Sequence, residues 1–126
     1  METLLIDGTE ETPQVEFNTE TSVYTISGRS LPEDATKFYD QLVDWVKAFC
    51  EKPKSEFALN INLDYFNSSS AKQLVELMIL LEALDKKECK VKIIWLYEEE
   101  DELMETRGKE IESIIDLPFT FSPITD

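Results

Sequence analysis

Three consecutive serines, Ser68, Ser69 and Ser70, follow Asn67 where an alternating apolar pattern gives way to a helical one. Backbone N–H groups at a helix start lack intrahelical partners, and the helix dipole is positive there. A serine hydroxyl in this place can cap the helix, and it can also carry a phosphoryl group that suits the same N–H groups. The run therefore offers two kinds of chemistry, capping and phosphorylation.

Capping accounts for one or two of these hydroxyls. Ser70 and Gln73 fit a capping box, which contributes about 0.5–2 kcal/mol, and Asn67 or Ser68 could cap equally well. A cap does not need three serines after an asparagine. From the residues alone, capping is favoured over signalling.

Catalysis by the serines has little support in the chain. The sequence contains no histidine, which removes Ser/His/Asp triads and histidine-ligated zinc. Ser70 and Lys72 do not have the Ser-x-x-Lys spacing, and the three glycines (Gly8, Gly28 and Gly108) are too scattered to form a phosphate-binding loop. We predict that the protein is not an enzyme and uses no cofactor.

The acidic run Glu98 to Glu102 is the other stretch that could do chemistry. Such a run is more often the solvated first turn of a helix, where carboxylates complement the dipole, and it lacks the glycine-containing loop of a calcium site. We therefore predict no metal site. A small metal-dependent hydrolase that uses Asp64 and this run is the alternative function.

Composition limits the partners. The 126 residues suffice for a single domain, residues 1–126, and 27 acidic against 12 basic residues give a net charge of −15. This charge repels nucleic acid and anionic lipid, and no apolar stretch approaches the roughly 20 residues that span a bilayer. Cys50 and Cys89 have no metal-binding spacing and are expected to be reduced. We predict a cytoplasmic protein that binds neither nucleic acid nor membrane.

Hydrophobic periodicity predicts the element order β-β-β-α-β-α-β-α. Strands are expected over 3–7, 14–18, 23–27, 56–65 and 90–97, and helices over 34–52, 69–87 and from 103 to 115. Residues 28–34 are expected to break the sheet, and 118–121 could form a closing edge strand.

The strand over 56–65 alternates between apolar residues and a polar set that includes Asn60, Asn62 and Asp64. A strand with helices on both faces would be apolar throughout. We therefore predict an α/β domain with a mixed sheet and helices packed mainly on one face.

The helix over 69–87 is more apolar than one contact face requires, because Leu77, Ile79 and Leu80 widen its apolar stripe. Burial between neighbouring elements is favoured, since burying such a side chain contributes roughly 1.5–3 kcal/mol. A partner surface, or a structural dimer formed through this helix, is the alternative.

Five motifs spread over nearly the whole chain resemble those of SiaC-type regulatory phosphoproteins, a STAS-like family related to the anti-sigma-factor antagonists. They are Thr12-Pro13-x-Val15, Ser27-Gly28-Arg29-Ser30-x-Pro32-Glu33-Asp34, Phe38-Tyr39, Tyr65-Phe66-Asn67-Ser68-Ser69-Ser70-Ala71-Lys72 and Trp95-x-Tyr97-Glu98-Glu99. Anti-sigma antagonists carry Asp-Ser-Ser-Gly-Leu at the serine turn, so a sigma-factor partner is not expected.

The resemblance implies a STAS-like fold and a phosphorylation switch. Ser68 is the implied phosphorylation site, with Ser69 as the alternative. The implied partners are a dedicated serine/threonine kinase, a PP2C-type phosphatase and an output protein, a diguanylate cyclase that the unphosphorylated form binds and activates. The expected partner surface comprises Tyr65, Phe66, Asn67, Ser70, Lys72, Gln73, Glu76 and Ile79.

Overall fold

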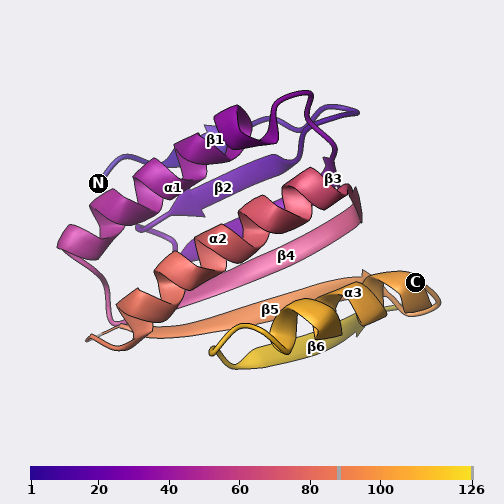
Figure 1. The fold of residues 1–126 in the computed structure, drawn as a ribbon. Helices are drawn as coiled ribbons and strands as arrows, with labels where there is room; N and C mark the ends of the chain where they lie inside the picture. Colours follow the sequence, from indigo (N-terminus) through magenta and orange to yellow (C-terminus); the bar gives the residue numbers. More distant parts are fainter. Residues whose placement is uncertain (88, 126) are drawn as a thin grey trace.

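Three helices cover one face of a six-stranded sheet (Figure 1). The computed structural model describes residues 1–87 and 89–125. The strands are β1 (Leu4–Ile6), β2 (Gln14–Asn18), β3 (Val23–Ser30), β4 (Glu56–Phe66), β5 (Lys90–Glu98) and β6 (Phe119–Ile124). The helices are α1 (Ala35–Glu51), α2 (Ser68–Asp85) and α3 (Glu102–Glu112). The predicted element order is confirmed, and the closing strand is present.

The sheet is mixed, and its strands lie side by side in chain order. The β1–β2 and β2–β3 pairs are antiparallel, whereas β3, β4, β5 and β6 run parallel. Each parallel connection needs a crossover, which α1, α2 and α3 supply on the same face. As a result the carboxyl ends of β3, β4 and β5 lie at one edge, with Ser30 paired to Phe66.

Strand β3 continues through Ser30, so the predicted break at residue 28 is wrong. The pairing with β4 shifts register between Gly28 and Arg29, and Gly28 has φ +99°, a conformation that favours glycine. The irregularity lies inside the strand and does not end it. Helix α3 ends at Glu112, three residues earlier than expected.

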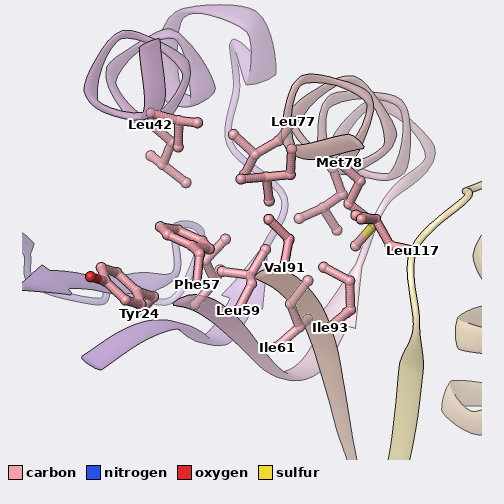
Figure 2. Packing of buried hydrophobic residues seen from close by; sticks show 14 of the residues in the cluster. Tyr24, Leu42, Phe57, Leu59, Ile61, Leu77, Met78, Val91, Ile93 and Leu117 are labelled. Carbon is pink, nitrogen blue, oxygen red and sulfur yellow. The ribbon is translucent and has the colours of Figure 1, made fainter. Parts of the chain in front are cut away.

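The core lies between the sheet and the helices (Figure 2). Phe57 pairs with Val91 and Leu59 with Ile93, and these side chains lie beneath α1 and α2. On the other face of β4, Asn60 and Asn62 are half-buried and Asp64 is exposed, which confirms the prediction of one covered face.

Burial divides the extra apolar residues of α2. Leu77 is buried and Leu80 partly buried, as the packing interpretation predicts, whereas Ile79 is 51% exposed. The alternative of a partner surface therefore applies to Ile79 alone among the three.

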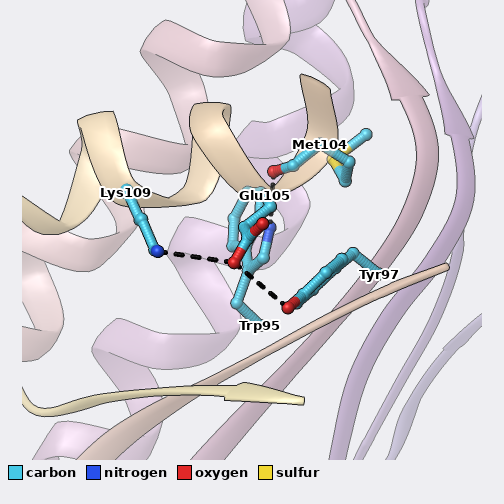
Figure 3. A network of polar contacts seen from close by, with 5 residues as sticks. All are labelled: Trp95, Tyr97, Met104, Glu105 and Lys109. Atoms are coloured by element: carbon cyan, nitrogen blue, oxygen red, sulfur yellow. Dashed lines mark hydrogen bonds and ion pairs between the residues drawn. The ribbon is translucent and has the colours of Figure 1, made fainter. Parts of the chain in front are cut away.

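Helix α3 packs tightly on β5 (Figure 3). Trp95 Nε1 donates to the Met104 carbonyl at 3.0 Å, and the ring lies so close to Gly108 that a Cβ there would be 2.5 Å from Nε1. The Tyr97 hydroxyl donates to Glu105, which also pairs with Lys109 at 3.3 Å. Glycine at 108 is thus required by close approach.

Neither cysteine is in a disulfide, and burial raises the pKa of both the Cys50 and the Cys89 thiol. A raised pKa keeps these thiols protonated at neutral pH. Within residues 1–87 and 89–125, no helix combines the length and apolar character that crossing a membrane would need.

Candidate functional site

The predicted site lies at the edge where β4 passes into α2. Asn67 is the N-cap of α2, and its Oδ1 accepts from the Ser70 N–H at 2.9 Å. The Asn67 N–H donates to the Ser30 carbonyl at 3.0 Å, which ties the start of α2 to the end of β3. Of the capping alternatives, the asparagine is the one the structure adopts. The Ser70–Gln73 capping box is wrong, because Ser70 lies inside the first turn.

The three serines have different environments. Ser68 and Ser69 are the first two residues of α2 and are exposed, whereas Ser70 is completely buried. The helix therefore begins one residue earlier than predicted, at Ser68. Only two of the three hydroxyls are open to an external protein.

Ser70 belongs to a buried chain of hydroxyls with Ser30 and Tyr39. Ser30 Oγ donates to Ser70 Oγ at 2.8 Å, and Ser70 Oγ donates to the Ser30 carbonyl at 3.0 Å. Since the Ser30 proton is used in this way, the Tyr39 hydroxyl must be the donor in its 2.7 Å bond to Ser30 Oγ. The chain joins β3, α1 and α2, and every hydroxyl proton in it has an acceptor.

Burial raises the pKa of Tyr39 to about 12. Tyr39 is therefore neutral at physiological pH, as its role as a donor requires. The raised pKa and the satisfied protons indicate a structural network that fixes the first turn of α2.

A cleft and an arginine side chain flank this first turn. Ser69, Lys72 and Gln73 line one side of a cleft of about 660 Å³, and residues 33–37 at the start of α1 line the other. Across the junction, Arg107 of α3 donates from Nη1 to the Phe66 carbonyl at 2.9 Å, and its guanidinium lies 4.9 Å from the Phe66 ring centroid.

The residues predicted to contact a partner fall into two sets. Lys72, Glu76, Tyr65 and Ile79 are exposed, and Asn67 is half-buried. The other three are buried in this conformation: Phe66, Ser70 and Gln73. Phe66 packs edge-on against Trp95, and Ser70 serves the hydroxyl chain. In this conformation they position the exposed set.

Three residues of the site were not predicted as site residues: Ser30, Tyr39 and Arg107. Ser30 and Tyr39 lie in two of the motifs that carry the resemblance, but only the parallel pairing of β3 with β4 brings them to α2. Arg107 carried no sequence signal, since its place depends on how α3 packs on β5.

The acidic run forms a different kind of helix start. Asp101 caps α3, and its Oδ1 accepts from the Met104 N–H at 3.1 Å. Over the part of the chain that the structure describes, no three Asp, Glu or Cys side chains are grouped so that they could hold a metal ion. The geometry therefore lends no support to the alternative hydrolase with Asp64.

Comparison with known proteins agrees with this geometry. A model of the SiaC family regulatory phosphoproteins matches residues 6–124. An uncharacterised protein of Pseudomonas aeruginosa strain UCBPP-PA14 is 28% identical over 119 residues, which cover 94% of each chain.

Solved structures of SiaC from Pseudomonas aeruginosa are also similar. Apo-SiaC has a TM-score of 0.88 at 26% identity, covering 97% of this chain and 99% of that one. A chain in the complex of the diguanylate cyclase SiaD with its activator SiaC has a TM-score of 0.89 at 26% identity, covering 96% and 99%. From the match over nearly its whole length, the chain belongs to the SiaC family of regulatory phosphoproteins.

Proposed function

We propose that this protein is a non-enzymatic cytoplasmic switch that is controlled by reversible phosphorylation of Ser68. Its unphosphorylated form binds and activates a diguanylate cyclase. The observation that carries the proposal is an exposed serine at the first position of a helix whose cap is uncharged. Such a position accepts a phosphoryl group, because free N–H groups and the positive end of the dipole stabilise it.

The difference in exposure among the three serines supports Ser68 or Ser69 as the phosphorylation site. A kinase cannot reach Ser70 without disrupting the buried hydroxyl chain with Ser30 and Tyr39. Ser68 and Ser69 are both accessible, and the family resemblance favours Ser68. Ser69 is the alternative.

The switch acts on the surface around the α2 start. Tyr65 and Ile79 are exposed apolar side chains near or on α2, and Lys72 and Glu76 add charge to the same helix. Phosphorylation adds about −1.5 to −2 charge to a chain that already carries −15. This charge repels an acidic partner and is costly to desolvate in an apolar interface.

A solved structure of a similar protein supports the proposed output partner. In Pseudomonas aeruginosa, SiaC is the activator of the diguanylate cyclase SiaD and forms a complex with it. We assign this chain a cognate diguanylate cyclase in the same way, together with a serine/threonine kinase and a PP2C-type phosphatase.

Phosphopeptide mapping of the protein from its native host, coupled to capture of the host's diguanylate cyclase, tests the proposal. Phosphate is expected on Ser68, and Ser68→Ala should capture the cyclase as the unmodified protein does. Ser68→Asp should capture it poorly. Ser55→Asp is the matched control, because it adds the same charge just before β4, at the strand's other end. Cyclase binding by Ser68→Asp as tight as wild type would overturn the proposal.

A further inference from the structure

Arg107 is the basic side chain held at the β4–α2 junction. Its Nη1 donates to the carbonyl of Phe66, two residues before Ser68, and its guanidinium lies over the Phe66 ring. A guanidinium has five N–H donors, so this bond leaves most of them available. The backbone bond and the ring contact together fix the position of the charge beside the start of α2.

Arg107 has no carboxylate partner among the described residues, although the chain contains 27 acidic side chains. The sequence has only one other arginine, Arg29. That guanidinium lies 5.7 Å from the Tyr65 ring centroid, and its Nε donates to the Glu10 carbonyl. The positive charge of Arg107 is thus half-exposed, fixed and unneutralised.

The helical phase of α2 turns Ser68 toward the side of α3. Glu82 accepts a hydrogen bond from the N–H of Asp116, in the segment that follows α3. Ser68 precedes Glu82 by close to four turns, at about 3.6 residues per turn, so both side chains leave α2 on nearly the same side. Ser69 leaves it on another side, into the cleft that Glu33 and Asp34 line from the start of α1.

We propose that Arg107 binds the phosphoryl group of phosphorylated Ser68 and so ties α3 to the start of α2. The inference rests on the proposed modification of Ser68. The planar guanidinium matches two phosphate oxygens at once, and an arginine–phosphate pair of this kind is a common way to convert phosphorylation into a fixed arrangement of elements.

The same geometry gives a reason for modifying Ser68 rather than Ser69. A phosphoryl group on Ser69 enters the cleft with Glu33 and Asp34, where two carboxylates oppose the attraction of Lys37 and Lys72. A phosphoryl group on Ser68 meets the unneutralised Arg107. Arg107 is therefore a specificity-determining residue for the phosphorylated state.

The test uses full-length protein with phosphoserine introduced at position 68 during translation, followed by phosphorus NMR across a pH titration. Phosphoserine has a second pKa of about 6, and a nearby positive charge lowers it. We expect the phosphate pKa in Arg107→Gln to lie about one unit above that in the Arg107 protein. Arg107→Lys keeps the charge but loses the bidentate geometry, so its phosphate pKa should fall between the two.

Arg29→Gln is the matched control, because it removes the other arginine, and it should leave the phosphate pKa unchanged. Phosphoserine at position 69 should not respond to Arg107→Gln. An unchanged pKa in Arg107→Gln, or an equal rise in Arg29→Gln, would overturn the assignment of Arg107.

A second readout needs no substitution of Arg107. In the phosphoserine-68 protein, the side-chain nitrogen resonances of Arg107 should shift as the phosphate titrates, while those of Arg29 stay constant. Arg107 resonances that ignore the titration contradict the inference even if Arg107→Gln fails to fold. Because the phosphoserine is installed without the host kinase, this result is separate from whether Ser68 is modified in the cell.

Discussion

Helices α2 and α3 begin alike and differ in charge. Each follows a parallel strand at the same edge of the sheet, and each is capped by a side-chain oxygen that accepts from the backbone N–H three residues on. In α3 the cap is Asp101, and Glu102 and Glu105 occupy the first turn. In α2 the cap is the neutral Asn67, and the first turn has no acidic residue.

This difference in charge bears on the proposed phosphorylation of Ser68. Carboxylates at the start of α3 complement the helix dipole at all times. The cap and first turn of α2 carry no negative charge, although the chain contains 27 acidic residues. A phosphoryl group on Ser68 would supply the charge there, and removing it would take the charge away.

The two helices are also anchored differently. A chain of buried hydroxyls from Ser30, Tyr39 and Ser70 holds α2, whereas close packing of Gly108 on Trp95 holds α3. Packing tolerates no added volume, and a polar network tolerates no lost partner. Substitutions that attack each anchor should therefore have different sizes.

The largest effect is expected for Gly108→Ala. The new Cβ would overlap the fully buried Trp95 ring, and this overpacking should outweigh the helix propensity that alanine adds. We predict a loss of about 3 kcal/mol in the free energy of unfolding. Urea unfolding measures it, with Thr106→Ala in the same helix as the control; a Gly108→Ala protein as stable as wild type would show that α3 is not anchored by this contact.

Alkaline pH should weaken the anchor of α2. Burial in the folded protein raises the pKa of Tyr39 from 10.0 to about 12. As pH rises, the Tyr39 phenol therefore ionises in the unfolded chain first. The stability that comes from the neutral phenol is complete below pH 10 and is lost as pH rises toward 12, a change of about 2–3 kcal/mol. Comparing wild type with Tyr39→Phe over this range isolates the contribution, since the variant should lack it. If the free energy of unfolding fell equally with pH in both proteins, the contribution of Tyr39 would be contradicted.

Removing the Ser70 hydroxyl should have a smaller effect. Ser70→Ala leaves the Ser30 proton without its acceptor, at a cost of about 1–2 kcal/mol. Ser69→Ala removes an exposed hydroxyl of the same helix turn and should change the free energy of unfolding by less than about 0.5 kcal/mol. Equal effects in thermal unfolding would mean that the hydroxyl chain does not fix α2.

Exchanging the caps should have the smallest effect. Asn67→Asp should stabilise the unphosphorylated protein by about 0.3–1 kcal/mol, because it places a negative charge at the uncharged helix start. Asp101→Asn should destabilise it, and less so, since Glu102 and Glu105 remain. Both changes in the free energy of unfolding should shrink as salt is added. Destabilisation by Asn67→Asp at low salt would remove the electrostatic contrast between the two helices.

The order of elements and the covered face of the sheet follow from local pattern. The alternation from Phe57 to Tyr65 and the three- to four-residue spacing in the helices are properties of neighbouring residues, and they predict strands and helices directly. The sequence pattern predicts too early an end for β3, because Gly28 and Arg29 interrupt the alternation. The pairing with β4 that continues the strand to Ser30 is non-local.

The candidate site divides in the same way. The serine run and its helix start are local and could be predicted, including the alternatives Ser68 and Ser69. Which hydroxyl is buried depends on contacts with Ser30 and Tyr39 across β3 and α1, and the place of Arg107 depends on the packing of α3. No spacing along the chain encodes those contacts.

The central claim is that a phosphoryl group on Ser68 switches partner binding. The direct measurement is the dissociation constant of the host's diguanylate cyclase for unmodified protein and for protein with phosphoserine at position 68, by calorimetry at one salt concentration. The account predicts that phosphorylation weakens binding by about tenfold or more, which is about 1.4 kcal/mol. Equal or tighter binding by the phosphorylated protein would contradict it.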